Sequence, residues 1–374
     1  MTVSTPGTSV HGDLDHPSFS IASLSLGTNV HHNLPTKIRT ASRLGYDAIE
    51  IFIPDFDAFV HEVGVGHHAD MFTDEDWLLV RATKDLELLC AKTIGRYCQE
   101  YGLVISCFQP FREFENFAGA SRMAKTKMGS LPPRLQVALD RAESYLRLMP
   151  ALQCDLLLVC SNLLPYDPIA ESYTERDYLD DQVAAFTELG QLASSYGVKI
   201  GHEALAWGTV VNRWEQVWEV VDRVDLPNVG VILDSFNQLG QQWADPSEPS
   251  GRRPLPPTVL SDNLLKLSRT IPVEKIFFYQ VADAAKPDSP IQSFPTFPSR
   301  MAWSRKMRLF PMEEEGYLPV LDFTNTLKRM GYKGVWSLEV FNASLDSLDE
   351  KTVESHGQRG IDGLRKLHEA CSHL

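Results

Sequence analysis

The sequence predicts an α/β protein, a single (β/α)8 TIM barrel with long strand-to-helix loops. Eight short apolar runs recur along the chain, and each is followed by a stretch with helical periodicity. Several helical stretches end at a glycine just before the next apolar run, as in LGYDAIEIF and YGVKIGHE, where glycine supplies the left-handed turn that ends a helix. The alternative is an open, doubly wound sheet. It has less support, because the sequence contains neither GxGxxG nor a P-loop.

The predicted strands are short apolar runs of the kind found in buried parallel sheets. In order, they are Ser20–Leu26, Ala48–Ile53, Val104–Phe108, Leu156–Val159, Val198–Glu203, Val229–Asp234, Ile276–Val281 and Val335–Val340. The predicted helices have apolar residues spaced by three and four positions. They are Pro35–Leu44, Asp76–Tyr101, Pro133–Met149, Glu175–Tyr196, Trp214–Val224, Val259–Ser268, Leu318–Met330 and Lys351–His373.

Long connections follow four of the predicted strands. They are Pro54–Asp74, Gln109–Leu131, Gln238–Pro257 and Ala282–Gly316. In a barrel, the loops after strands build the active face. The alternation of strands and helices resumes after each loop, so residues 18–374 are expected to form one catalytic domain, and the polar residues 1–17 a flexible tail.

The composition of the chain excludes some classes of binding partner. The formal net charge of −14 argues against nucleic acid and anionic membrane surfaces, which bind basic footprints, so a small-molecule substrate is expected. We find no membrane-spanning run and no signal peptide, which predicts a cytoplasmic protein. The six cysteines form no CxxC pair and are expected to be buried free thiols. The sequence leaves the oligomeric state open, a homo-oligomer included.

Four predicted strands in succession end on side chains that can bind a metal: Glu203, Asp234, Gln280 and Glu339. The carboxyl ends of barrel strands converge on the ligand, so these residues are expected to lie together. Taken singly, an acid at a strand end is more often a solvated loop residue or an ion-pair partner. Three carboxylates and an amide on neighbouring strands instead suit a hard divalent cation such as Mg²⁺ or Mn²⁺. Strand alternation points the adjacent His202 toward the helices, which favours a structural role for it.

Specific blocks of sequence resemble the xylose isomerase-like TIM barrels, and within them the 3-dehydroshikimate dehydratases of quinate and shikimate catabolism, especially the single-domain fungal form. The blocks HEALAWGTVVNRWEQVWEVV, MAWSRKMRLFP and GVWSLEVFN carry most of the resemblance, and further matches extend it over residues 20–342. LGYDAIEIF is common to the whole superfamily and discriminates little.

The resemblance implies roles for seven residues. Glu203, Asp234, Gln280 and Glu339 correspond to the ligands of a divalent metal ion (Mg²⁺, Mn²⁺ or Co²⁺), and Glu203 and Glu339 are also candidates for catalysis. Arg112, Ser304 and Arg308 match positions expected to hold the substrate. A guanidinium suits the substrate's carboxylate because it forms two parallel hydrogen bonds. Arg305 lies in the same motif as Arg308 and is an alternative to it.

The implied reaction is metal-dependent dehydration of 3-dehydroshikimate to protocatechuate and water. It requires loss of the C4 proton and of the C5 hydroxyl. In many relatives a histidine follows the strand-six aspartate by three positions, whereas this chain has Asn237, which cannot accept a proton near neutral pH. The base therefore stays open between a metal-site carboxylate, with Asn237 as its neighbour in the site, and a loop histidine (His31, His32, His67 or His68). Asp283 is a further candidate for ligating or orienting.

Two other functions remain open. A sugar or inosose isomerase, epimerase or dehydratase would share the metal ligands but would not need an arginine for a carboxylate. A barrel that binds a metabolite without turning it over would be free to lose one of the four ligands, so the complete set argues against it.

Overall fold

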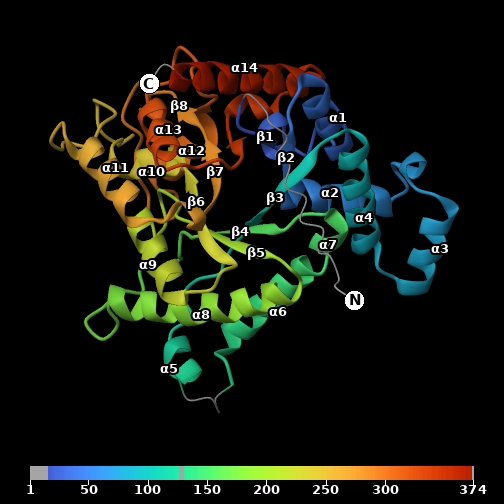
Figure 1. Ribbon diagram of the computed structural model, residues 1–374, viewed down its shortest axis with the longest axis horizontal. Coiled ribbons are helices and arrows are strands. Elements are labelled where there is room, and N and C mark those ends of the chain that lie inside the picture. The colour runs from blue at the N-terminus through green and yellow to red at the C-terminus, as the bar shows by residue number, and fades with distance from the viewer. Residues whose placement is uncertain (1–15, 126–129, 373–374) are drawn as a thin grey trace.

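Eight parallel strands close into a barrel in the computed structural model, which describes residues 16–125 and 130–372 (Figure 1). Around the barrel they are β1 (Phe19–Ala22), β2 (Ala48–Phe52), β3 (Val104–Phe111), β4 (Leu156–Cys160), β5 (Lys199–Glu203), β6 (Val229–Asp234), β7 (Ile276–Val281) and β10 (Trp336–Leu338), which closes on β1. All eight predicted strands are present and the barrel itself is confirmed, but the first strand, predicted over Ser20–Leu26, ends at Ala22, and Ser23–Leu26 form a 3-10 helix. Residues 1–15 of the predicted tail lie outside the described residues.

Helices cover the outside of the barrel (Figure 1). The main ones are α1 (Leu34–Leu44), α4 (Leu86–Glu100), α6 (Pro133–Leu146), α8 (Glu175–Ser195), α9 (Trp214–Val224), α11 (Val259–Thr270), α13 (Val320–Arg329) and α14 (Thr352–Ser372). The prediction of one helix over Asp76–Tyr101 is wrong, because α3 (Asp74–Thr83) and α4 are separate. The chain breaks at Lys84, whose φ is 57°. Asp85 then starts α4 by accepting a hydrogen bond from the Leu88 amide (3.0 Å).

The long connections contain helices that the sequence analysis treated as loop. They are α2 (Ile53–Gly64), α5 (Ala120–Lys125), α10 (Ser235–Gln242) and α12 (Ser299–Met307), and a short α7 (Met149–Leu152) follows α6. In α2 the apolar residues Phe56, Phe59 and Val63 are spaced by three and four and are buried along one face. That spacing predicts a helix. Pro54 and the two aspartates that follow it obscured that signal.

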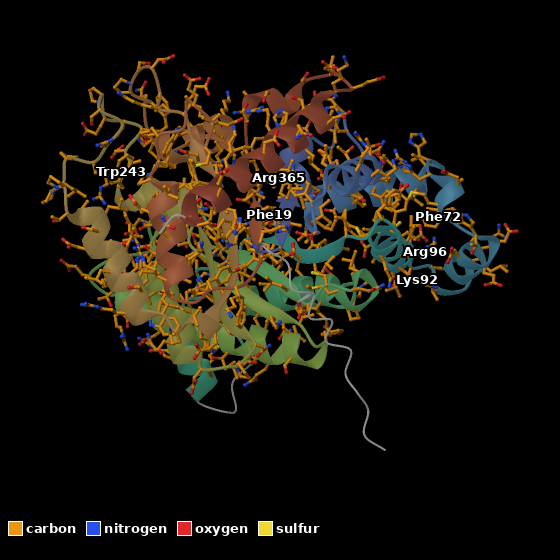
Figure 2. The ribbon with its side chains drawn as sticks, turned by 45° about the horizontal axis from the view of Figure 1, so that its top comes forward. Phe19, Phe72, Lys92, Arg96, Trp243 and Arg365 are labelled. Carbon is orange, nitrogen blue, oxygen red and sulfur yellow. The ribbon has the colours of Figure 1, made fainter. Side chains whose placement is uncertain are left out.

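The excursion between α2 and α4 packs on the outside of the barrel. Phe72 lies between Phe59 (centroids 6.5 Å apart) and Trp77 (5.2 Å), and Arg96 of α4 donates to the carbonyl oxygen of Met71 (2.7 Å) (Figure 2). These contacts hold the excursion against α4. Within the described residues, no helix is both long and apolar enough to cross a membrane. All six cysteines are buried and free, as predicted.

Serine side chains tie the strand ends together at the carboxyl edge of the barrel. Ser25, in the 3-10 turn η1 (Ser23–Leu26) after β1, accepts from the Val340 amide (2.8 Å). Ser235, directly after β6, accepts from the Ala282 amide (2.9 Å) and donates to the carbonyl oxygen of the same residue (2.8 Å). The backbone just beyond β7 and β10 is therefore fixed by side chains from other strands.

A buried ion pair holds the first two strand ends. The Lys37 ammonium group of α1 lies 2.8 Å from the Asp55 carboxylate of α2, and Ser23 donates to the same Asp55 oxygen (2.6 Å). Burial lowers the pKa of Lys37, and Asp55 opposes that shift. Removal of one partner would leave the other charge buried without compensation.

We therefore expect Lys37→Met to lower the free energy of unfolding by about 3–5 kcal/mol, measured by urea-induced unfolding. Arg43→Met is the control, because Arg43 and Glu354 form a pair of similar length (2.8 Å) whose side chains are more than half exposed. Water screens such a pair, so its loss should change stability little. Equal losses in the two variants would contradict the interpretation.

Candidate metal centre

Three carboxylates meet at the carboxyl edge of the barrel. Glu203 is the last residue of β5, Asp234 is the last residue of β6, and Glu339 follows β10 directly. Each offers an oxygen atom, and these oxygens lie within 4.8 Å of one another. All three residues are at most 6% exposed. Convergence of these strand ends was predicted from the barrel, and the structure brings them together.

Gln280 of β7 lies beside the carboxylates, opposite Asp234 in the register of β6 and β7. Its Nε2 donates to Glu50 Oε2 of β2 (2.9 Å). Its Oε1 is buried and has no hydrogen-bond partner among the described residues. A buried carbonyl oxygen without a partner is costly in a folded protein, and a bound cation would satisfy it.

Asn237, in the first turn of α10, holds two of the carboxylates. Its Nδ2 donates to Glu203 Oε1 (2.8 Å) and to Asp234 Oδ2 (3.1 Å), while its Oδ1 accepts from the Ala206 amide (3.0 Å). The contact to Ala206 fixes which end of the amide faces the carboxylates. Asn237 is therefore placed to orient Glu203 and Asp234, and its amide has no role as a proton acceptor.

Arg308, the first residue of β9 (Arg308–Leu309), reaches into the same cluster. Its Nη1 donates to Asp234 Oδ2 (2.7 Å), to Glu339 Oε2 (3.1 Å) and to the Glu339 carbonyl oxygen (3.0 Å). Its Nε donates to Ser304 Oγ of α12 (3.1 Å), and the guanidinium lies 4.3 Å from the Phe236 ring centroid. The two residues predicted to hold the substrate through WSRKMR thus contact each other, and Arg308 is paired with the carboxylates.

Crowding of charge shifts the pKa values in this cluster. Burial, followed by the charges of Glu339 and Asp234, raises the pKa of Glu203 well above its ordinary value. Burial raises the pKa of Glu339 to about 7 although Arg308 opposes it. Burial would lower the pKa of Arg308, but Asp234 and Glu339 together raise it. The carboxylates compete for positive charge, which is the environment that a cation stabilises.

Two further arginines lie near the cluster without anionic partners. Arg305 of α12 packs its guanidinium over Phe341 (4.9 Å) and Trp207 (5.9 Å). Burial lowers its pKa, and the positive charges of Arg112 and Arg308 lower it further. Arg112, just after β3, is exposed. Within the described residues, no hydrogen bond or ion pair involves either guanidinium. Unpaired positive charge beside a buried site favours an anionic ligand.

Other candidates from the sequence have partners elsewhere. His202 faces α8 as predicted: its Nδ1 donates to the Val159 carbonyl oxygen (3.1 Å), its ring lies 4.3 Å from that of Phe186, and burial lowers its pKa to about 4. Asp283 Oδ1 accepts from the amides of Ala284 (2.7 Å) and Leu318 (2.9 Å), so it fixes a loop.

Of the four loop histidines, two are exposed, His31 and His67. His32 contacts the Ser347 carbonyl oxygen (3.0 Å), and His68 pairs with Glu62 (2.7 Å).

The sequence analysis missed two residues that contact the predicted ligands. Gln109 of β3 donates through Nε2 to Glu339 Oε1 (3.1 Å), and its own Oε1 is buried without a partner among the described residues. Glu50 is fully buried, and burial together with the charge of Glu339 raises its pKa to about 8. Glu50 had a signal, because it is a polar residue inside the predicted buried strand Ala48–Ile53. Gln109 directly follows the predicted strand Val104–Phe108 and was assigned to a loop, whereas β3 extends to Phe111.

Comparisons with known proteins agree with this architecture. A family model described as xylose isomerase-like TIM barrel matches residues 38–367. The chain is 30% identical to a 3-dehydroshikimate dehydratase from Neurospora crassa, covering 93% of this chain and 92% of that protein. It is 33% identical to a 3-dehydroshikimate dehydratase from Pseudomonas putida over 93% of this chain, but spans only 41% of that longer protein.

A solved structure shows the same relation. It is a xylose isomerase-like TIM barrel/4-hydroxyphenylpyruvate dioxygenase fusion protein that is 31% identical to this chain, with a TM-score of 0.65. The match covers 95% of this chain and 43% of the fusion protein.

Loss of Arg308 would leave Asp234 and Glu339 without their buried ion-pair partner. We expect Arg308→Leu to lower the free energy of unfolding by about 3–5 kcal/mol in the presence of a chelator, measured by urea-induced unfolding. Arg305→Leu is the matched control from the same helix–strand segment, since Arg305 has no ion pair among the described residues. If the two variants were equally destabilised, the pairing of Arg308 would not account for the loss.

Proposed function

Because the chain belongs to the xylose isomerase-like TIM barrel family, we propose that it is a metal-dependent 3-dehydroshikimate dehydratase that forms protocatechuate and water. The observation that carries the proposal is the buried carboxylate cluster with unpaired arginines beside it. The match to the Neurospora crassa 3-dehydroshikimate dehydratase supports it, because it covers 93% of this chain and 92% of that protein.

Four residues would hold the metal ion: Glu203, Asp234, Gln280 and Glu339. All four present oxygen atoms, the donor type that Mg²⁺, Mn²⁺ and Co²⁺ accept, and the orphaned Gln280 Oε1 fits a cation. A bound divalent cation supplies positive charge that stabilises negative charge developing on the substrate's oxygen atoms. The identity of the ion, as Mg²⁺, Mn²⁺ or Co²⁺, is part of the proposal.

Arg112 and Arg305 are proposed to bind the substrate's carboxylate. Each guanidinium can form two parallel hydrogen bonds with a carboxylate, and neither makes a hydrogen bond or ion pair with another of the described residues, although the charge of Glu339 acts on Arg305. Substrate contacts by Ser304 and Arg308 remain predictions. Arg308 also pairs with Asp234 and Glu339, and this pairing holds the two carboxylates in place.

The reaction removes a proton from C4 and the hydroxyl from C5, which leaves as water, and a proton moves from C6 to the oxygen on C3 as the ring becomes aromatic. We propose that Glu203 accepts the C4 proton. Asn237 occupies its Oε1, so Oε2 is the oxygen directed to the reaction.

The unpaired arginines also weigh against a sugar or inosose isomerase on the same barrel. Ketoses and inososes carry no carboxylate, so two uncompensated guanidinium groups beside the cluster would have no ligand to pair with. A panel of ketoses and inososes, assayed beside 3-dehydroshikimate, separates these functions.

The direct test mixes the purified protein with 3-dehydroshikimate and follows the absorbance of protocatechuate with and without chelator. The wild-type protein should form protocatechuate only when metal is present. Glu203→Ala and Glu339→Ala should each lose at least about 1000-fold in kcat and also fail to retain metal, because each removes a ligand and a catalytic group together.

Asp155→Ala provides the control for these variants. Asp155 pairs with Lys199 at the opposite end of β5 from Glu203, on the exposed surface, and its loss should leave activity unchanged. An active Glu203→Ala protein without metal would overturn the proposal, and so would a wild-type protein that turns over only a ketose or inosose.

The carboxylate site has its own test. We expect Arg305→Met to lower kcat/KM for 3-dehydroshikimate by about 10- to 100-fold, the loss of one or two charge-assisted hydrogen bonds. Arg305→Lys should recover only part of this, since an ammonium group cannot form the paired contact. The adjacent exposed Lys306 is the control, and Lys306→Met should behave as wild type. Unchanged kcat/KM in Arg305→Met would remove Arg305 from the site.

A further inference from the structure

A fully buried carboxyl group, Glu50, lies inside the barrel with no basic side chain in contact among the described residues. Its two hydrogen-bond partners are Gln280, which donates to Oε2 (2.9 Å), and Ser337 of β10, which donates to Oε1. Cys107 lies opposite Glu50 in the register of β2 and β3 and belongs to an apolar cluster with Leu158 and Phe278. Burial of an acid in such a place costs free energy that an apolar residue of similar size would not.

The contact with Glu50 determines which end of the Gln280 amide faces the carboxylate cluster. Nε2 is bound by Glu50, so Oε1 is left as the free, buried acceptor. Turned over, the amide would place its oxygen against Glu50 Oε2 and present hydrogen atoms to the cluster. A metal ion binds the oxygen of an amide and is repelled by its N–H groups.

Ser337 holds the other oxygen of Glu50, so that Oε2 remains the acceptor for Gln280. It lies opposite Gln280 in the register of β7 and β10, and its hydroxyl holds Glu50 Oε1. Oε2 stays an acceptor whether the carboxyl group is ionised or holds a proton on Oε1 beside the serine oxygen. The arrangement therefore depends on position and hydrogen bonding, and not on the charge of Glu50.

We propose that Glu50 is a positioning residue for the metal centre: it locks the Gln280 side-chain amide so that Oε1 is presented to the cation. This rests on the proposed function in so far as it takes Gln280 as a ligand. Outer-shell partners of this kind orient metal ligands in other proteins, and their loss typically weakens metal binding by about 10- to 100-fold.

Two substitutions separate position from charge. Glu50→Asp keeps the carboxyl group but withdraws it from Gln280 by one methylene group, whereas Glu50→Gln keeps the acceptor oxygen in place without the charge. Titration of the metal-stripped full-length protein with Mn²⁺ should show affinity about 10-fold or more weaker for Glu50→Asp, and within about threefold of wild type for Glu50→Gln. Wild-type affinity in Glu50→Asp, or equal losses in both variants, would overturn the proposal.

One control variant distinguishes the contact with Gln280 from general packing of the interior. Cys107 neighbours Glu50 in the register of β2 and β3, so Cys107→Ala disturbs the same interior without touching Gln280 and should bind Mn²⁺ as wild type. A loss in Cys107→Ala equal to that in Glu50→Asp would make the effect one of packing, and overturn the inference.

Gln280→Leu tests the ligand itself. If it binds Mn²⁺ normally, the proposed ligand set fails. If it binds weakly while Glu50→Asp binds normally, the ligand set stands and only the inference about Glu50 fails.

Discussion

The concentration of three carboxylates in a buried space is the constraint on which the rest of this structure depends. Like charges at this distance repel strongly where water is excluded, so the fold needs positive charge at that position. Among the side chains of the protein, Arg308 supplies this positive charge. It arrives on the long excursion after β7, where α12 ends and β9 begins, and this explains why a segment resembling a surface loop in the sequence contains one of the largest fully buried side chains in the described part of the chain.

Neutral polar side chains also stabilise the carboxylate cluster that Arg308 contacts. Asn237 and Gln109 direct N–H groups at the carboxylates, which favours ionised oxygens without adding charge. Gln280 does the opposite and leaves an acceptor free, so its amide has to be held in one orientation. Serine side chains fix the backbone just past β7 and β10, and with it the distance between ligands on different strands. The serine contacts join the ends of neighbouring strands, β6 with β7 and β1 with β10, and ligand positions on such regular elements are more precise than positions on loops.

The sequence was sufficient for the barrel and for the convergence of Glu203, Asp234, Gln280 and Glu339, because each signal is local: an apolar run that ends on a polar side chain. Closure of the sheet then brings the four together by topology. The partners of Arg308 could not be predicted from the sequence, because these contacts depend on the path of the long excursion after β7. Glu50 and Gln280 are 230 positions apart, and no local pattern indicates that their side chains meet. In α2, Pro54 and two aspartates resembled a loop, although Pro is well tolerated in the first turn of a helix.

The three arginines near the carboxylate cluster differ in whether a carboxylate balances their charge. The negative charges of three carboxylates would be balanced by the Arg308 guanidinium and one divalent cation. A centre that holds the cation would therefore be formally neutral and would not need another positive side chain. Arg112 and Arg305 are outside that balance. Burial lowers the pKa of Arg305, the charges of Arg112 and Arg308 lower it further, and the charge of Glu339 opposes these shifts. A ligand with a carboxylate would add negative charge beside the two guanidinium groups, whereas a neutral sugar would not. Arg305 and Arg308 are three positions apart, yet the change from helix to strand between them sends the Arg308 guanidinium to Asp234 and Glu339 and leaves the Arg305 guanidinium over the rings of Phe341 and Trp207.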